Sequence, residues 1–329
     1  MVQVLESKNN LVIDGFAIPD HPEPLPKILV LLAAHNGADW ISAQIDSILG
    51  QVGVEVRVVI RDDGSSDATA DIIAKISKDD ARVELIEAGD ATGSAAKNFF
   101  RLVLTCDGSS YDFIALSDQD DVWHSGKLSR AVDLLRRTQA SGYSGAVTAV
   151  WPGGRARVLR QETAMTQSDY LFEGAGQGCT YVVTGPLYRR IRDFLASNGE
   201  LTATIHYHDW TIYALARAWG LSWVFNQQPT MDYRQHSGND TGARSSFQGV
   251  LKRFGKIRSG WYLQQLLGVS DICYAVAKSS PVVATWHSLL RSPRTWRRRL
   301  AIAGFCLRGG RRRIADNGIL VLSALVGWI

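Results

Sequence analysis

Three carboxylates lie within four residues of one another, directly after the apolar run YDFIALS at residues 111–117. They are Asp118, Asp120 and Asp121. Unpaired carboxylates at this spacing repel one another, and a bound cation relieves the repulsion. Mg²⁺ or Mn²⁺ held through one or two carboxylates, with water and substrate phosphates completing the octahedron, is the usual arrangement for a hard ion. An acidic surface turn is the alternative, but the preceding apolar run, Trp123 and a second acidic turn favour a metal site.

The second acidic turn is DDGSSD, which follows the apolar run VEVRVVI. Its glycine permits a tight bend, and one of its last three residues caps the helix that follows. Asp62 and Asp63 precede the cap and are left to accept hydrogen bonds from a nucleobase N–H or a ribose hydroxyl. Asn36, after the first apolar run KILVLLAA, is by itself an ordinary turn residue.

Four other residues are ambiguous by type alone. Arg234 can clamp a phosphate through its planar guanidinium, and His236 can ligate a metal or contact a diphosphate, but a surface strand end explains both equally well. Lys97 suits a nucleotide or sugar contact, or it lies on an ordinary helix. Cys179 is more simply a small core residue than a nucleophile.

These residues need a scaffold, and the hydrophobic pattern supplies one between residues 27 and 227. The predicted strands are 27–34, 54–60, 82–88, 111–117, 179–185 and 221–227, and the predicted helices are about 39–49, 67–76, 94–104, 127–138, 186–195 and 208–219. Apolar strands alternating with amphipathic helices are typical of a mainly parallel sheet covered on both faces. We therefore predict a doubly wound α/β sheet, in which ligands bind beyond the carboxyl ends of the strands. No G-x-G-x-x-G follows the first strand and no G-x-x-x-x-G-K-[ST] occurs, which argues against a dinucleotide dehydrogenase and a P-loop ATPase.

Charge divides the chain into an acidic and a basic part. The net charge is +4, yet residues 241–329 hold fifteen Lys and Arg against two acids and look wholly helical. We predict an N-terminal arm over residues 1–26, an α/β domain that carries the acidic motifs over 27–240, and a basic helical region over 241–329.

The basic region carries nine arginines between residues 286 and 313, interleaved with Trp, Phe and Leu. Such helices suit an anionic membrane surface, where each basic group contributes about 1 kcal/mol. The alternative is a bundle packed on the catalytic domain with a solvated arginine face. Nucleic-acid binding is disfavoured because no recognised module accompanies the charge.

Targeting and cysteine signals are both weak. No apolar run is long enough to span a membrane, and the first residues lack the layout of a secretory signal. The four cysteines form no CxxC pair. We expect a cytoplasmic protein, peripheral on the inner face of the cytoplasmic membrane.

Taken together, the motifs resemble the family 2 glycosyltransferases with the GT-A fold, in particular their bacterial rhamnosyltransferase-like branch. Over about residues 27–240 the matching segments are AAHNGADWISAQIDSIL, RDDGSSDATADII, KNFFRL, FIALSDQDDVWHSGKL, GCTYVV, HDW and YRQHSGND. The resemblance implies metal-dependent, inverting transfer of one hexose, with L-rhamnose the candidate, from a dTDP- or UDP-sugar to a saccharide acceptor, free or polyprenyl-linked. The Q-x-x-R-W of processive synthases is missing, which favours addition of a single sugar.

The resemblance also implies residue roles. Asn36 and Asp39 line the nucleotide pocket, and Asp62 or Asp63 holds the nucleobase. Asp118 and Asp120 form the metal-diphosphate motif, with His236 as a third metal ligand. The other motif residues divide into a donor side, Ala34, Lys97, Gln119 and Arg234, and an acceptor side, Trp123, His208 and Trp210.

Asp209, in the HDW motif, is implied as the catalytic base. An inverting displacement needs a cation for the leaving diphosphate and a base on the opposite face of the sugar. A first-turn helix acid is the alternative for an isolated aspartate. Two other functions also fit the residues: a metal-dependent phosphoryl-transfer or hydrolytic enzyme, and a membrane-bound scaffold with an inactive site.

Overall fold

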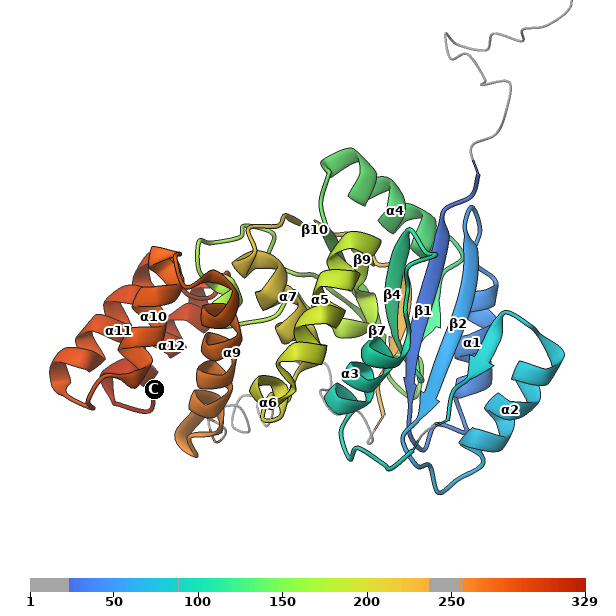
Figure 1. Ribbon diagram of the computed structural model, residues 1–329, viewed down its shortest axis with the longest axis horizontal. Coiled ribbons are helices and arrows are strands. Elements are labelled where there is room, and N and C mark those ends of the chain that lie inside the picture. Colours follow the sequence, from blue (N-terminus) through green and yellow to red (C-terminus); the bar gives the residue numbers. More distant parts are fainter. Residues whose placement is uncertain (1–23, 88, 237–254, 256) are drawn as a thin grey trace, which may run out of the picture.

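The computed structural model describes residues 24–87, 89–236, 255 and 257–329. Figure 1 shows a central sheet flanked by helices, with a group of further helices at the opposite end of the molecule. The predicted N-terminal arm lies almost entirely outside the described residues. The end of the YRQHSGND motif and the predicted boundary at residue 240 lie outside them too.

The central sheet has seven strands in the order β10-β6-β9-β4-β1-β2-β3. The strands are β1 (Lys27–Ala34), β2 (Glu55–Asp62), β3 (Val83–Leu85), β4 (Phe113–Asp118), β6 (Gly142–Gly145), β9 (Val182–Thr184) and β10 (Trp223–Asn226). All neighbours pair in parallel except β9, which is antiparallel to both β4 and β6. The inner strands are apolar on both faces because helices cover both. The predicted mainly parallel doubly wound sheet is confirmed.

Two sets of helices cover the two faces of the sheet. The helices of this part are α1 (Ile41–Leu49), α2 (Thr69–Asp79), α3 (Ala95–Thr105), α4 (Lys127–Thr138), α5 (Gly185–Ser197), α6 (Gly199–Thr202) and α7 (His208–Ala218), with short 3-10 turns η1 (Asp169–Leu171) and η2 (Gly178–Thr180). Apolar residues of α3, α5 and α7 fill one core, and those of α1 and α4 fill the other. The sheet that carries the predicted site residues is thereby packed against helices on both faces.

A second sheet of four strands was not predicted. Its order is β5-β11-β7-β8, with bounds β5 (Val122–Trp123), β11 (Met231–Arg234), β7 (Val147–Val150) and β8 (Ala156–Leu159). These strands are only two to four residues long, too short for a period to register. The pairing of β5 with β11 brings the chain after Arg234 back to the acidic motif that precedes β5.

The C-terminal part is helical, as predicted. It comprises α9 (Trp261–Ala277), α10 (Pro281–Arg291), α11 (Trp296–Gly309) and α12 (Ile314–Leu325). Its apolar side chains join the core that contains Leu29 of β1, and Trp286 packs against Phe172. These helices therefore pack as a bundle on the rest of the protein, which is the alternative given above for the basic region. Among the helices of the described residues, none combines the length and the apolar composition that crossing a bilayer would need.

Three arginines of the basic region lie inside this packing. Arg312 donates to the buried Asp169 at 2.7 Å and to the carbonyl of Gly174 at 2.7 Å. Arg311 donates to the carbonyl of Phe172, and Arg298 donates to backbone carbonyls of α10 and of the C-terminal residue. These charges join the helices to the catalytic part instead of forming a solvated face.

Candidate active site

The predicted site residues gather at the carboxyl ends of three adjacent strands. In the ladders, Ala34 of β1 lies opposite Asp62 of β2, and Ala33 lies opposite Asp118 of β4. Ala34 is buried, and its carbonyl accepts from the backbone N–H of Asp63 at 2.8 Å. The two acidic turns are thus neighbours in space, as the predicted topology requires.

Gln119 fastens the turn after β1 to the turn after β4. Its side-chain oxygen accepts from the backbone N–H of His35 at 2.7 Å, and its amide nitrogen donates to the His35 carbonyl at 2.6 Å. A β-carbon at residue 37 would clash with this amide, so Gly37 is required there. Gln119 has a positioning role in this geometry, and its predicted contact with the donor stays a prediction.

The carboxylate of Asp63 is buried and fully engaged by the protein. It accepts from Arg61 at 2.6 Å, from the backbone and hydroxyl of Thr92 at 2.7 and 2.8 Å, and from the Gly93 N–H at 3.0 Å. Burial by itself would raise the pKa of Asp63, but the hydrogen bonds from Thr92, Arg61 and Gly93 outweigh it and lower that pKa. Asp63 therefore anchors the loop 90–93, and a nucleobase would have to compete with these donors.

The turn after β1 is held by the turn after β2. Asn36 has a positive φ of 49°, and its side-chain oxygen accepts from the Ser66 N–H at 2.8 Å. Asp62 accepts from the backbone N–H and hydroxyl of Ser65, whose side chain in turn accepts from the Asn36 N–H. The N-cap of α2 is Ala68, which has no side-chain cap, so the predicted cap by one of the residues 65–67 is wrong. Asp67, just before it, still accepts from the Thr69 N–H at 3.0 Å.

Asp39 is exposed beside these turns. Asn36, Asp39 and Asp62 thus lie on the neighbouring turns after β1 and β2. Their nucleotide contacts remain predictions.

His236 joins the acidic motif after β4. Its Nε2 lies 2.7 Å from Oδ2 of Asp120, and its ring stacks on Trp40 with centroids 4.0 Å apart. Trp40 precedes α1 and Arg234 ends β11, so residues far apart in sequence meet here. The structure brings together the predicted ligands Asp120 and His236, and it adds Trp40, which the sequence did not single out.

Asp121 lies beneath this motif and is fully buried. Ligand atoms of Asp118, Asp121 and Cys179 all lie within 4.8 Å of one another, and neither oxygen of Asp121 has a hydrogen-bond partner in the described part of the chain. Burial, followed by the charges of Asp120 and Asp118, raises the pKa of Asp121 well above its ordinary value. Cys179 is thus a buried member of this cluster, although its thiol is no activated nucleophile, because burial raises its pKa as well.

Lys127 supplies a buried positive charge near the cluster, which the sequence did not reveal. Its ammonium lies 3.4 Å from the centroid of the Trp123 ring, and it has no hydrogen-bond partner in the described ranges. Burial lowers the pKa of Lys127 to about 7, against the opposing effects of Cys179 and Asp121.

The donor set fits a divalent cation. Two carboxylates at a strand end with an imidazole beside them are ligands that Mg²⁺ and Mn²⁺ accept. Asp121, whose oxygens make no hydrogen bond in the described part of the chain, lies beside Asp118 and adds a further carboxyl to this end of the sheet. The predicted ligands Asp118, Asp120 and His236 do not form the group of ligand atoms within 4.8 Å of one another, which in the described residues is Asp118, Asp121 and Cys179. Asp120 is paired with His236 instead, and the predicted ligand set stays a prediction.

Asp209 occupies the first turn of α7, close to the same cluster. A β-carbon on Gly178 would lie 3.1 Å from that of Asp209, while the next residue, Cys179, belongs to the acid cluster. Two consecutive residues of η2 therefore lie between the candidate base and the acidic motif: Gly178 is next to Asp209, and Cys179 is next to Asp118 and Asp121. One oxygen of Asp209 accepts from the Trp210 N–H at 2.7 Å, and burial raises the pKa of its carboxyl to about 6 despite that bond.

The three residues predicted to face the acceptor are buried instead. Trp123 is 3% exposed in the core, and Trp210 donates from its indole to the Tyr170 carbonyl at 2.8 Å. His208 stacks on Phe99, and burial lowers its pKa to about 3, so its ring is neutral. Their burial contradicts direct contact with an acceptor. In both motifs the tryptophan packs in the core, whereas the aspartates lie at the candidate site.

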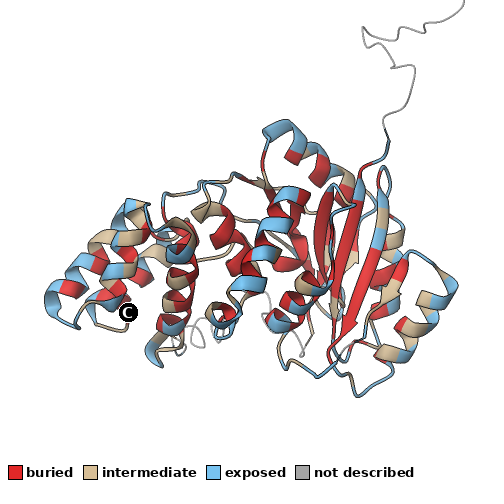
Figure 2. Cartoon of the chain, viewed as in Figure 1, coloured by how far each residue is buried: buried red, intermediate tan, exposed pale blue. Residues whose placement is uncertain are grey.

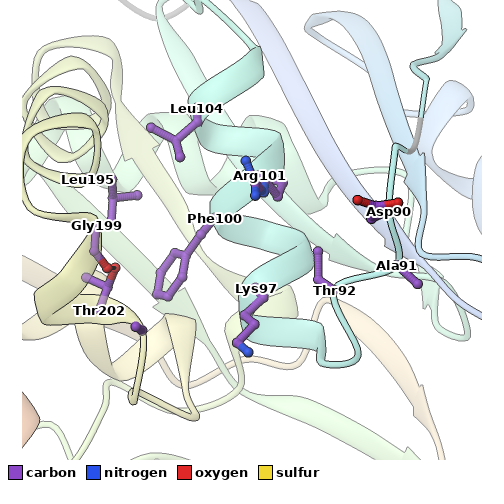
Figure 3. Close-up of a pocket in the computed structure, with 11 residues that line it drawn as sticks. Asp90, Ala91, Thr92, Lys97, Phe100, Arg101, Leu104, Leu195, Gly199 and Thr202 are labelled. Carbon is purple, nitrogen blue, oxygen red and sulfur yellow. Dashed lines mark hydrogen bonds between the residues drawn. The ribbon is translucent and has the colours of Figure 1, made fainter.

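Lys97 lines a pocket between α3 and the α5–α6 segment, away from the acidic motif after β4. The pocket has a volume of about 430 Å³. In Figure 3, Phe100 of α3 faces Gly199 and Thr202 across it. Thr92, which also lines the pocket, donates from its hydroxyl to Asp63 at 2.8 Å. Lys97 thus lies near the loop 90–93 that Asp63 anchors, and not in the cluster of Asp118 and Asp121. Its donor contact stays a prediction.

Comparison with known proteins identifies the family. Residues 29–192 match the family model for glycosyl transferase family 2. The dTDP-rhamnosyl transferase RfbG of Shigella flexneri is 37% identical over 250 residues, which are 76% of this chain and 86% of that protein. The chain belongs to glycosyl transferase family 2. It is a rhamnosyltransferase-like glycosyltransferase that uses a nucleotide sugar.

Other similarities are more distant. This family 2 chain is 32% identical over 108 residues to the UDP-Glc:alpha-D-GlcNAc-diphosphoundecaprenol beta-1,3-glucosyltransferase WfaP of Escherichia coli, covering 33% of this chain and 41% of WfaP. The structure of S. aureus TarS 1–349 in complex with UDP superposes with a TM-score of 0.54 at 12% identity, covering 92% of this chain and 87% of TarS 1–349. At that identity the superposition shows the shared GT-A fold alone.

Proposed function

We propose that this family 2 glycosyltransferase moves a single hexose, with L-rhamnose the candidate, from a dTDP- or UDP-sugar to a saccharide acceptor, with inversion at the anomeric carbon. The observation that carries the proposal is the junction at η2. Cys179 lies with Asp118 and Asp121 on one side, and Gly178 lies against Asp209 on the other. A leaving-group site and a proton acceptor thus flank one short turn. The similarity to RfbG, a dTDP-rhamnosyl transferase, supports dTDP-rhamnose as the first donor to test.

The leaving diphosphate would lie at the acids after β4. Asp118, Asp120 and His236 would hold Mg²⁺ or Mn²⁺, which when bound acts as a Lewis acid for the departing diphosphate. Gln119 joins the turns after β1 and β4 through two hydrogen bonds, which fixes the acids relative to the predicted nucleotide-binding residues. The chain's own part in this half of the reaction is to hold the cation and to position the diphosphate.

Asp209 would take the proton of the acceptor hydroxyl. Since burial raises the pKa of Asp209 to about 6, the carboxylate is ionised near neutral pH yet more basic than an exposed aspartate. The backbone N–H of Trp210 fixes one oxygen and leaves the other for the acceptor. This arrangement and the family membership favour sugar transfer over phosphoryl transfer or hydrolysis.

The acceptor would be a saccharide carried on a polyprenyl diphosphate. The support is the similarity to WfaP, which is named for its action on a diphosphoundecaprenol-linked sugar, together with the basic C-terminal helices. A lipid-linked acceptor would place the enzyme on the inner face of the cytoplasmic membrane.

A transfer assay tests the proposal. Purified protein would be incubated with dTDP-L-rhamnose or UDP-glucose, Mn²⁺ and saccharide acceptors with and without a diphosphopolyprenyl group. We expect release of the nucleoside diphosphate in step with a glycosylated product whose anomeric configuration, by NMR, is opposite to that of the donor. A product of retained configuration would exclude single displacement, and release without product would favour hydrolysis.

A further inference from the structure

The outer sides of α11 and α12 expose a set of large apolar residues. Leu307 of α11 is 68% exposed, and Leu322 and Ile314 of α12 are 63% and 90% exposed. The whole set, which we call the outer face, is Trp296, Leu300 and Leu307 of α11 with Ile314, Ile319, Leu322, Leu325 and Val326 on or directly after α12. Figure 2 shows these helices at the end of the molecule farthest from the sheet. Eight of the twelve exposed large apolar residues in the described part of the chain are concentrated here.

Helical spacing collects these residues into stripes. Trp296, Leu300 and Leu307 recur at intervals of four and seven, which places them on one side of α11. The opposite side carries Ile302 and Cys306, which are buried in the shared core. In α12 the exposed positions 314, 322 and 325 likewise lie opposite the buried Leu320 and Ala324. Both stripes therefore point away from the core. The guanidinium carbon of Arg297 lies 5.5 Å from the centroid of the Trp296 ring, and the apolar side chains of the stripes stay exposed.

The same helices carry exposed positive charge. Arg294, Arg297, Arg299, Arg308 and Arg313 are exposed. Of the two acids of residues 241–329, Asp271 is paired with Arg291 and His287, and, against the lowering effect of burial, Asp316 helps to raise the pKa of Arg311. Arg313 pairs with Glu162 at 3.8 Å, while Arg294, Arg297, Arg299 and Arg308 have no acid partner within the described residues. The outer face thus combines apolar side chains with an excess of exposed arginines, which is the composition of helices that lie in the interface of an anionic bilayer.

This set differs from the one that the sequence suggested. Trp286 and Ile302 are buried, and Arg298, Arg311 and Arg312 bind backbone carbonyls or Asp169 within the fold. A periodic sequence shows that a helix is amphipathic, but not which side another helix covers.

We propose that the outer face docks on the surface of an anionic phospholipid bilayer. The stripes of α11 and α12 enter the boundary between headgroups and acyl chains, and the exposed arginines pair with lipid phosphates. A second copy of the chain fits less well, because a symmetric contact would oppose arginine to arginine. Docking rests on the proposed place of the enzyme at the membrane, but vesicle binding needs neither donor nor acceptor, so its failure is distinguishable from failure of sugar transfer.

Two double variants and two matched controls test the docking. Leu307→Ser/Leu322→Ser removes exposed apolar area, and Arg297→Gln/Arg308→Gln removes exposed charge. Val52→Ser and Arg136→Gln make the same changes at exposed positions of the catalytic part. Because all of these side chains are on the surface, unchanged thermal unfolding temperatures would show that the fold is intact.

The measurement is co-sedimentation with vesicles of phosphatidylglycerol and phosphatidylcholine, compared with phosphatidylcholine alone. We expect binding to the anionic vesicles only, with release at about 1 M NaCl, where the Debye length is about 3 Å. The arginine double variant should bind roughly 25-fold more weakly, at about fivefold per charge, and the leucine double variant at least about tenfold more weakly. Both controls should bind like the wild type.

Three results would overturn the proposal. The first is absence of binding to anionic vesicles at low salt. The second is wild-type binding by both double variants. The third is a wild type that is a dimer in analytical ultracentrifugation and binds no vesicles, with a leucine double variant that is a monomer. In that case the outer face would be the contact with a second copy of the chain.

Discussion

The imidazole Nε2 of His236 lies 2.7 Å from Oδ2 of Asp120, although 116 residues separate them in sequence. The contact depends on β11, which pairs with β5 directly after the acidic motif and returns the chain to it. Trp40 stacks on one face of the imidazole, with the ring centroids 4.0 Å apart. The acidic motif and the histidine therefore form one unit built by the second sheet.

His236→Ala should weaken Mn²⁺-dependent binding of dTDP roughly 10- to 100-fold, the range for loss of a residue that ligates or orients the ligands of a metal. Isothermal titration calorimetry would measure it. His124→Ala is the matched control, because His124 also faces a carboxylate, that of Asp232 at 3.3 Å, but on the exposed surface. Equal losses in the two variants would contradict a special role for His236.

Asp209→Asn should lose about 10²–10⁴-fold in kcat while keeping its affinity for the donor, because a positioned proton acceptor is removed. In the wild type kcat/KM should fall as the pH drops below about 6, where Asp209 becomes protonated. The residual rate of the variant should lack this limb. Loss of donor binding at unchanged chemistry would make Asp209 a binding residue instead.

The same substitution should stabilise the fold at neutral pH. The pKa of Asp209 is about 6 in the folded protein against 3.8 for the free side chain, so the folded state holds its proton more tightly. Above about pH 6 the folded state carries a buried charge that the unfolded state solvates, and below about pH 4 both states are protonated. Asp209→Asn should therefore raise the free energy of unfolding by about 1–3 kcal/mol at pH 8 and leave it unchanged near pH 3.5. Urea unfolding at the two pH values measures this, and an equal gain at both would refute the charge explanation.

The central sheet could be predicted because its signals are local. The first predicted strand coincides with β1 (Lys27–Ala34), and the acids were found because they directly follow apolar runs. Strand β6 was missed since its residues are GYSG. Gly142 is needed there because a β-carbon would clash with the Trp223 ring of β10, a requirement that appears only when the two strands are paired.

The candidate site was predictable only in part for the same reason. Asp118, Asp120 and His236 could be proposed from motifs, whereas Trp40 and Cys179 become members of the site only once the strands and η2 are assembled. The tryptophans of the motifs were misassigned to the acceptor because an aromatic side chain beside an acid suits either a sugar or the core. Burial decides for the core.

Arg312→Ala should destabilise the protein by about 3–5 kcal/mol, because it leaves the fully buried Asp169 with one cation fewer. Its neighbour provides the control: Arg313 is exposed and reaches Glu162 only at 3.8 Å, so Arg313→Ala should cost less than about 1 kcal/mol. Chemical unfolding compares the two. Similar small losses would mean that the C-terminal helices are not held by the buried pair.

The central claim is that a cation at Asp118 and Asp120 organises a nucleotide-diphosphate site. Calorimetric titration tests this claim most directly, with dTDP added to the wild type and to Asp120→Asn in Mn²⁺ and in EDTA. Asp120 lies next to the orphaned Asp121 and against His236, and asparagine keeps its shape while removing its charge. We expect the wild type to bind dTDP in Mn²⁺ and to lose at least about tenfold in affinity in EDTA, and Asp120→Asn to bind weakly in both, with an unchanged unfolding temperature. Equal affinity of the wild type with and without metal, or wild-type affinity in Asp120→Asn, would contradict the account.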